Sequence, residues 1–110
     1  MEIQQALEEF LEAIKSSEAF KDYQYQKQRV KKYSGLAERI NEFRKRRYEF
    51  QNYAGDDLFE KIDDFEREFK DFEEDPVVRE YLAAELEICR RIQEVNAAIT
   101  DLIDIDMDLL

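Results

Sequence analysis

The side chains that could carry out chemistry in this chain are mostly carboxylates, with one thiol and no imidazole. The 110 residues include 28 Asp and Glu, a single Cys and no His. Without histidine, the chain lacks the commonest general base and the commonest transition-metal ligand, and Glu-x-x-His di-iron sites are excluded. The sequence also contains no Gly-rich phosphate loop and no nucleophile paired with a base. We therefore predict that the protein is not an enzyme.

Two smaller features could suggest a metal or a cofactor. Asp104, Asp106 and Asp108 have the spacing that opens a calcium-binding loop, but the required Gly and closing Glu are missing. Cys89 is the single cysteine of the sequence, so no disulfide can form within the chain. One thiolate alone cannot hold an iron–sulfur cluster, which normally needs four. We therefore expect an acidic tail, a cysteine that packs as a small hydrophobic residue in the core, and no cofactor.

Charge is distributed unevenly along the chain. The formal net charge is −11, which argues against general binding of nucleic acid. Residues 21–48 nevertheless hold ten Lys and Arg against three acids, whereas residues 56–75 hold eleven acids against three bases. These opposite charges predict attraction between the two segments, within one chain or across a dimer.

The densest part of the basic segment is a run of four cations. It consists of Arg44, Lys45, Arg46 and Arg47. The run could be a solvated or internally paired face, or it could bind an acidic protein partner. RNA binding is a further alternative, because tyrosines at positions 23, 25 and 33 alternate with Lys and Arg nearby. We predict partner binding by this run.

The composition predicts helices rather than sheets. Only two Gly and one Pro interrupt the 110 residues, and the apolar residues recur at intervals of three and four. The fold class we expect is all-α, an antiparallel bundle of about five helices with a long C-terminal helix. The expected helices cover residues 2–15, 18–33, 36–53, 58–72 and 76–103.

The long C-terminal helix is the best-defined of these elements. Asp75 can cap its first turn, and Pro76 suits the first helical position because its missing N–H costs nothing there. One face is a wide apolar stripe, which in a soluble chain needs to be covered. We therefore predict an oligomer, a homodimer or larger, whose interface includes this stripe. The predicted self-association residues are Val78, Tyr81, Ile88, Ile92, Val95 and Ile99.

Length and hydropathy bear on domain organisation and location. A chain of 110 residues is most simply one helical domain, residues 1–110, with residues 105–110 as a frayed tail. There is no apolar run long enough to span a membrane and no signal-peptide pattern at the amino terminus. These features predict a cytoplasmic location without membrane contact.

Two segments together resemble a known family. Ile40–Gln51 (INEFRKRRYEFQ) and Asp75–Glu85 (DPVVREYLAAE) are similar to the YlbF/YmcA family of small helical regulators in Gram-positive bacteria. The resemblance implies a cytoplasmic protein that associates with itself or with related subunits. It also implies a regulatory role in competence, sporulation and biofilm formation, in some members together with RNase Y in mRNA processing. A complex of family members has been linked to iron–sulfur clusters.

The resemblance and the residues together lead to one functional prediction. Because this chain offers only Cys89, we do not expect it to bind a cluster. We predict a non-enzymatic regulatory or adaptor protein that acts through protein–protein interaction. An RNA-binding helical protein that uses the Tyr/Lys/Arg segment, and a purely structural assembly protein, are the alternatives.

Overall fold

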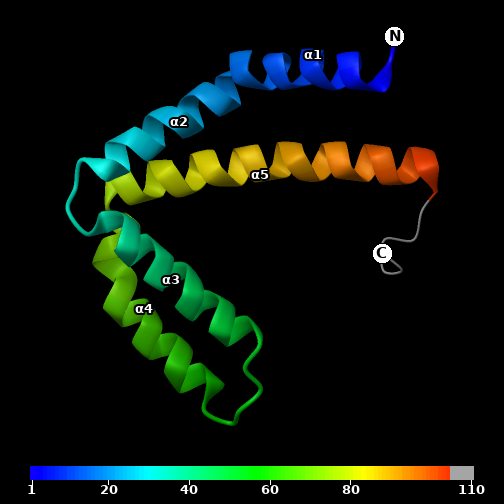
Figure 1. Cartoon of the computed structure of the whole chain (residues 1–110). Coiled ribbons are helices and arrows are strands. Elements are labelled where there is room, and N and C mark those ends of the chain that lie inside the picture. The colour runs from blue at the N-terminus through cyan, green and yellow to red at the C-terminus, as the bar shows by residue number, and fades with distance from the viewer. Residues whose placement is uncertain (105–110) are drawn as a thin grey trace. The chain divides into compact units, whose positions relative to one another are not determined.

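A computed structural model describes residues 1–104, and these fold into helices (Figure 1). They contain no β-strand, so the all-α prediction is confirmed for this part of the chain. The predicted frayed tail, residues 105–110, lies outside the described residues. The helices are α1 (Ile3–Ser16), α2 (Glu18–Lys31), α3 (Leu36–Gln51), α4 (Leu58–Glu74) and α5 (Pro76–Ile103).

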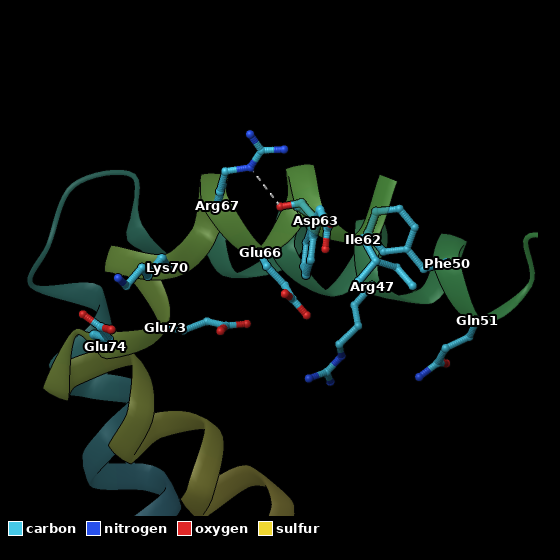
Figure 2. A pocket seen from close by; sticks show the side chains of 11 residues that line it. Arg47, Phe50, Gln51, Ile62, Asp63, Glu66, Arg67, Lys70, Glu73 and Glu74 are labelled. Atoms are coloured by element: carbon cyan, nitrogen blue, oxygen red, sulfur yellow. Dashed lines mark hydrogen bonds between the residues drawn. The ribbon is translucent and has the colours of Figure 1, made fainter. Parts of the chain in front are cut away.

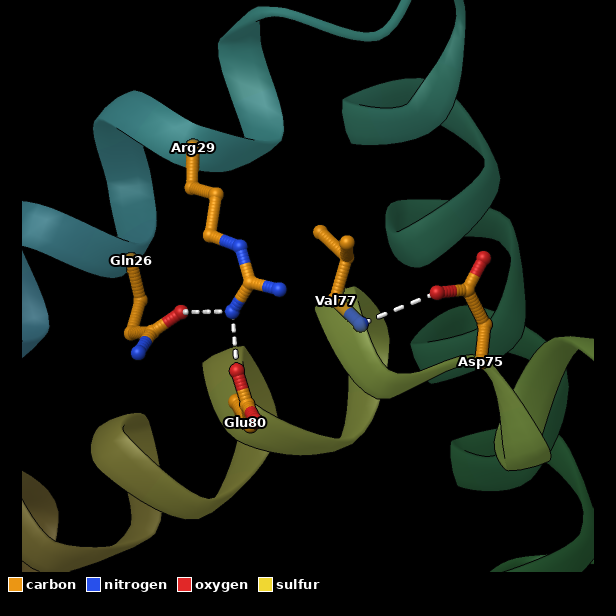
Figure 3. A network of polar contacts seen from close by, with 5 residues as sticks. All are labelled: Gln26, Arg29, Asp75, Val77 and Glu80. Atoms are coloured by element: carbon orange, nitrogen blue, oxygen red, sulfur yellow. Dashed lines mark hydrogen bonds and ion pairs between the residues drawn. The ribbon is translucent and has the colours of Figure 1, made fainter.

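The helix boundaries follow local backbone chemistry. The backbone N–H of Phe20 donates to Ser17 Oγ over 3.3 Å, so Ser17 caps α2. At the start of α5, the backbone N–H of Val77 donates to Asp75 Oδ1 over 2.9 Å (Figure 3). Asp75 therefore caps α5, as its sequence predicts, with Pro76 as the first helical residue. Before α3, Gly35 takes a φ of +78°, a left-handed conformation that glycine adopts without a Cβ penalty.

The described chain divides into two compact units, which we treat separately. Unit 1 comprises residues 1–24 and the described residues from Leu82 onward, and unit 2 comprises Tyr25–Tyr81. Helices α2 and α5 each contribute residues to both units. The organisation of residues 1–110 as one domain, and the packing of the five helices into one antiparallel bundle, stay predictions.

Unit 2 is built around a cluster of phenylalanines from α3 and α4. The ring centroid of Phe43 on α3 lies 5.3 to 5.5 Å from those of Phe65, Phe69 and Phe72 on α4. The ring of Phe50, two turns further along α3, has its centroid 5.1 Å from that of Phe65, in the middle of α4. These pairings make α3 and α4 an antiparallel hairpin (Figure 1). Each buried ring contributes roughly 1.5–3 kcal/mol to folding, with a further ~0.5–1.5 kcal/mol for a well-placed ring pair.

Unit 1 lacks such a core. Among its described residues only Ala84 is buried. Large apolar side chains on both α1 and α5 remain exposed, although their helical spacing is that of packed residues. They are Ile3, Leu7, Phe10, Leu11, Leu86, Ile92, Ile99, Leu102 and Ile103.

Phe69→Ala tests the importance of the phenylalanine cluster. The Phe69 side chain is 0% exposed, so its truncation leaves a cavity that should lower the free energy of unfolding by about 3–5 kcal/mol. Phe59→Ala is the matched control, since Phe59 lies on the same helix and is 80% exposed. Urea denaturation followed by circular dichroism measures both variants. An equal loss of the free energy of unfolding in the two variants would contradict the assignment of Phe69 to the core.

Candidate protein-interaction surfaces

Arg46 lies against the phenylalanine cluster and is half-buried. Its guanidinium carbon is 5.6 Å from the ring centroid of Phe65 and 5.3 Å from that of Phe69, and Arg46 forms an ion pair with Glu68 on α4. Cation–π contacts of this kind contribute roughly 0.5–1 kcal/mol each at partly exposed sites. The ion pair joins the basic α3 to the acidic α4, in agreement with the attraction predicted between the two segments.

The rest of the basic run is divided between aromatic contacts and solvent. Arg44 Nη2 is 3.4 Å from the hydroxyl oxygen of Tyr81, and its guanidinium carbon is 5.6 Å from the centre of that ring. The guanidinium of Arg47 lies 5.2 Å from the ring of Phe43, and its side chain is otherwise exposed. Lys45 is exposed. The run is therefore not a uniform patch, because only Lys45 and Arg47 offer their charge freely to a partner.

Arg39 has a similar role that the sequence pattern did not indicate. Its guanidinium carbon lies 4.8 Å from the ring centroid of Phe69 and 5.4 Å from that of Phe72. Arg39, Arg46 and Arg47 thus all cover the same aromatic cluster. The spacing of arginines along α3 could have suggested a shared face, but the phenylalanines that they cover lie mostly on α4, about 25 residues away.

A polar network connects α2 to the first turns of α5 within unit 2. Gln26 is buried, and its Oε1 accepts from Arg29 Nη1 over 3.3 Å (Figure 3). The same guanidinium nitrogen forms an ion pair with Glu80, which lies 51 residues further along the chain. The hydrogen bond to Glu80 raises the pKa of Arg29 above its ordinary value. No local sequence pattern could have predicted this pair.

The six predicted self-association residues are placed in different environments. Val78 is 0% exposed and belongs to the core of unit 2, and Tyr81 is half-buried beside Arg44 in the same unit. Ile88 and Val95, in unit 1, are half-buried. Ile92 and Ile99, also in unit 1, are 54% and 51% exposed. Only the unit 1 part of the stripe is therefore available to a second chain.

Unit 1 has a groove of about 910 Å³, lined by exposed and half-buried apolar residues. One wall comes from α1 and the start of α2, including Phe10, Ile14 and Phe20, and the other from α5, including Ile88 and Ile92. The lining is mainly apolar, as expected for a surface that binds another apolar surface.

Cys89 lies in this groove and is exposed. The prediction that it packs as a small core residue is therefore wrong for the single chain. The physical reason is that unit 1 has too few helices to enclose both faces of α5, so a residue at the edge of the apolar stripe stays accessible.

Residues 1–104 do not place three or more Asp, Glu, Cys or His side chains where they could hold a metal ion together. Over the same residues, no helix is both long enough and apolar enough to cross a membrane.

The loop between α3 and α4 contains a hydrogen-bonded pair of a tyrosine and a carboxyl group. The Tyr53 hydroxyl donates a hydrogen bond to Asp57 Oδ1. This bond lowers the pKa of the Asp57 carboxyl below its ordinary value and raises the pKa of the Tyr53 hydroxyl above its own. The contact closes the loop just before α4 begins.

Comparison with known proteins gives one result that agrees with this architecture. The sequence pattern of the family described as "Control of competence regulator ComK, YlbF/YmcA" matches residues 3–104, nearly the whole chain. The chain therefore belongs to the YlbF/YmcA family, and the predicted family resemblance is confirmed. The family description is that of a regulator. No curated protein and no solved structure gives a significant match.

Arg46→Gln tests whether the basic run stabilises the hairpin. Removing the guanidinium deletes two ring contacts and the ion pair with Glu68, so the free energy of unfolding should fall by about 1 kcal/mol. Lys45→Gln removes the same charge from a neighbouring exposed position and should change the free energy of unfolding by less than about 0.5 kcal/mol. Chemical denaturation measures both, and a larger loss for Lys45→Gln would reject the structural role of Arg46.

Tyr53→Phe tests the hydrogen bond to Asp57. Without the hydroxyl donor, the pKa of Asp57 should rise toward its ordinary value. The matched control is Tyr48→Phe, at an exposed tyrosine on α3, which should leave the pKa of Asp57 unchanged. Because the folded-state pKa is the lower one, the bond's contribution to stability is present above the unfolded-state pKa and is lost as the pH falls through the folded value. Carboxyl-carbon NMR titration gives the pKa directly. An unaltered Asp57 titration in Tyr53→Phe would show that the bond is absent.

Proposed function

We propose that this protein is a non-enzymatic regulatory adaptor that acts by binding proteins, first of all further copies of itself or of related family members. Membership of a family of regulators supports the regulatory role. The physical support comes from unit 1, whose exposed apolar side chains need a covering surface.

The observation that carries the proposal is the apolar face of unit 1. We define this face by Leu7, Phe10 and Leu11 on α1 and Ile92 and Ile99 on α5, all of them exposed in the single chain. A soluble monomer rarely keeps so many large apolar side chains in water, and contiguous patches of this kind mark binding surfaces. Burial of such side chains contributes roughly 25 cal/mol per Å² of apolar area removed from water.

A second copy is the simplest occupant of this face. Each copy carries the same helices, so two copies related by a two-fold axis can cover both faces at once. A related family member with the same apolar spacing on its first and last helices could do the same. The bundle that the sequence predicts would then be completed between subunits rather than within one.

The wider context of the proposal rests on the family resemblance. We propose that the protein acts in the cytoplasm, as a regulator of competence, sporulation or biofilm formation that works with RNase Y in mRNA processing, and membership of the family supports this. In such an assembly, Lys45 and Arg47 are the cations of the basic run that can contact a partner, since both are exposed. Arg44 and Arg46 are engaged with rings of their own chain.

RNA binding through the Tyr/Lys/Arg segment has weaker support. Three arginines of α3 lie on phenylalanine rings of their own hairpin, which leaves fewer cations for phosphate contacts. The net charge of −11 also opposes RNA at long range. A gel-shift assay at low salt separates the two functions, because an RNA-binding protein would retard RNA in a salt-dependent manner.

Ile92→Glu combined with Ile99→Glu tests self-association. Two carboxylates on the apolar face should convert the assembly to monomers at micromolar concentration, because burying an unpaired charge costs several kcal/mol. The matched control is Gln93→Glu combined with Ala97→Glu, which adds charge of the same sign at exposed positions of the same helix. Sedimentation velocity measures the oligomeric state of both variants.

Two results would contradict the proposal. The wild-type chain could be a monomer at micromolar concentration, or the Ile92 and Ile99 variant could remain an oligomer of unchanged size. Circular dichroism establishes that both variants keep the helical content of the wild type, so loss of assembly is not confused with unfolding.

A further inference from the structure

Unit 2 has a groove of its own, of about 850 Å³, along the α3–α4 hairpin (Figure 2). Its apolar lining comes from Phe50 on α3 and from Ile62 and Phe65 on α4. Phe50 and Ile62 are only half-buried, so part of the aromatic cluster is still accessible from this side. The groove is thus a partly exposed seam between two packed helices.

The walls of the groove carry charge in a regular arrangement. On α4, Asp63, Glu66, Lys70 and Glu73 follow one another at intervals of three, four and three, so they lie along one edge. On α3, Arg47 and Gln51 are one turn apart on the opposite edge. Figure 2 shows Arg47, Gln51, Glu66 and Glu73 extending toward the same side of the hairpin.

Several of these charges form no ion pair within the described residues. Within residues 1–104, Glu66, Glu73 and Glu74 take part in no ion pair, and Arg47 contacts a ring but no carboxylate. Arg67, a second α4 cation in the lining beside Lys70, points away in Figure 2 and pairs with Asp64 over 2.6 Å. The α4 edge therefore carries four carboxylates, those of Asp63, Glu66, Glu73 and Glu74, against one cation, Lys70, and keeps a net negative charge. The α3 edge carries one cation, Arg47.

We propose that this groove binds an amphipathic helix of another protein. The apolar stripe of that helix packs on Phe50, Ile62 and Phe65, and its Lys or Arg residues face the acidic edge of α4. A third helix fits between two antiparallel ones because ridges of side chains pack into the groove at an axial distance of about 8–10 Å. The lining from Ile62 to Glu74 is about 18 Å long, which accommodates about three turns of helix.

Charge argues against a second copy of this chain as the occupant. The helices with a free apolar face are α1 and the unit 1 part of α5. Acids outnumber cations on both: Glu8, Glu9 and Glu12 against Lys15 on α1, and Glu85, Glu87, Glu94 and Asp101 against Arg90 and Arg91 on α5. Their net negative charge would be repelled by the acidic edge of α4. The basic α2 has its apolar side occupied, because Gln26 and Val30 are buried inside unit 2. A basic helix from a different protein is the complementary partner.

This inference names a class of partner for the proposed adaptor, but it depends on unit 2 alone. Experiments can therefore contradict helix binding by unit 2 and still support self-association through unit 1. They can equally support helix binding and contradict self-association. The Ile92→Glu and Ile99→Glu variant, which lacks the apolar face of unit 1, should keep its groove and still bind the partner helix.

The test uses a synthetic probe with the proposed chemistry. A fluorescein-labelled amphipathic peptide of Leu and Lys, of about fourteen residues or four turns, is titrated with the full chain and followed by fluorescence anisotropy. A peptide of the same pattern with Glu in place of Lys is the control ligand. The Leu/Lys peptide should bind and the Leu/Glu peptide should not.

Charge reversal locates the binding surface. Glu66→Lys combined with Glu73→Lys should weaken binding of the Leu/Lys peptide by about tenfold, the result of losing two charge pairs and gaining two repulsions. Glu9→Lys combined with Glu12→Lys makes the same change in net charge on α1 and should leave the affinity within about twofold. Arg47→Gln removes the cation from the opposite edge and should tighten binding of this all-Lys peptide.

Three outcomes would overturn the inference. Equal weakening by the two charge reversals would mean that the peptide senses only the net charge, and no weakening by the α4 variant would place the peptide elsewhere. A change of oligomeric state caused by Glu66→Lys combined with Glu73→Lys would mean that a second copy occupies the groove. Because neither carboxylate has a partner in residues 1–104, circular dichroism should show the α4 variant folded.

Discussion

The packing of phenylalanines between α3 and α4 is the interaction on which the described structure depends most. The ring of Phe43 contacts those of Phe65, Phe69 and Phe72, and these four residues are among the nine apolar residues that are buried in residues 1–104. Arginines from α3 then cover the outer surfaces of the cluster with their planar guanidinium groups. A small hairpin thereby obtains a stable core without a third layer of helices along its whole length.

The two units differ in how much of their apolar surface they bury. Unit 2 buries four of its phenylalanine rings, and it connects α2 to the start of α5 through Gln26, Arg29 and Glu80. Unit 1 has comparable apolar periodicity but buries only Ala84 among its described residues. A helix that keeps a wide apolar stripe after its own chain has folded is suited to assembly, and this contrast is the physical basis of the proposed adaptor function.

Much of the candidate surface could be predicted from residue types, but its roles could not. The three- and four-residue spacing of apolar residues predicts the stripe on α5. Within that stripe, however, Val78 is fully buried and Ile92 is exposed. Similarly, Arg44 to Arg47 look equivalent in sequence, whereas Arg46 pairs with Glu68 and Lys45 stays in solvent. Periodicity states which side chains share a face, but only the positions of neighbouring helices decide how much of that face is covered.

The sequence by itself determined the helices, their boundaries at Ser17, Gly35 and Asp75, and the family, because capping, backbone freedom and helical spacing act over a few residues. Only the tertiary structure decided that Cys89 is exposed, that Arg29 meets Glu80 across 51 residues, and that α3 and α4 leave a charged groove between them. Those outcomes depend on contacts between segments distant in the chain. Such contacts arise from the packing of whole helices, and the local pattern around any one residue does not contain them.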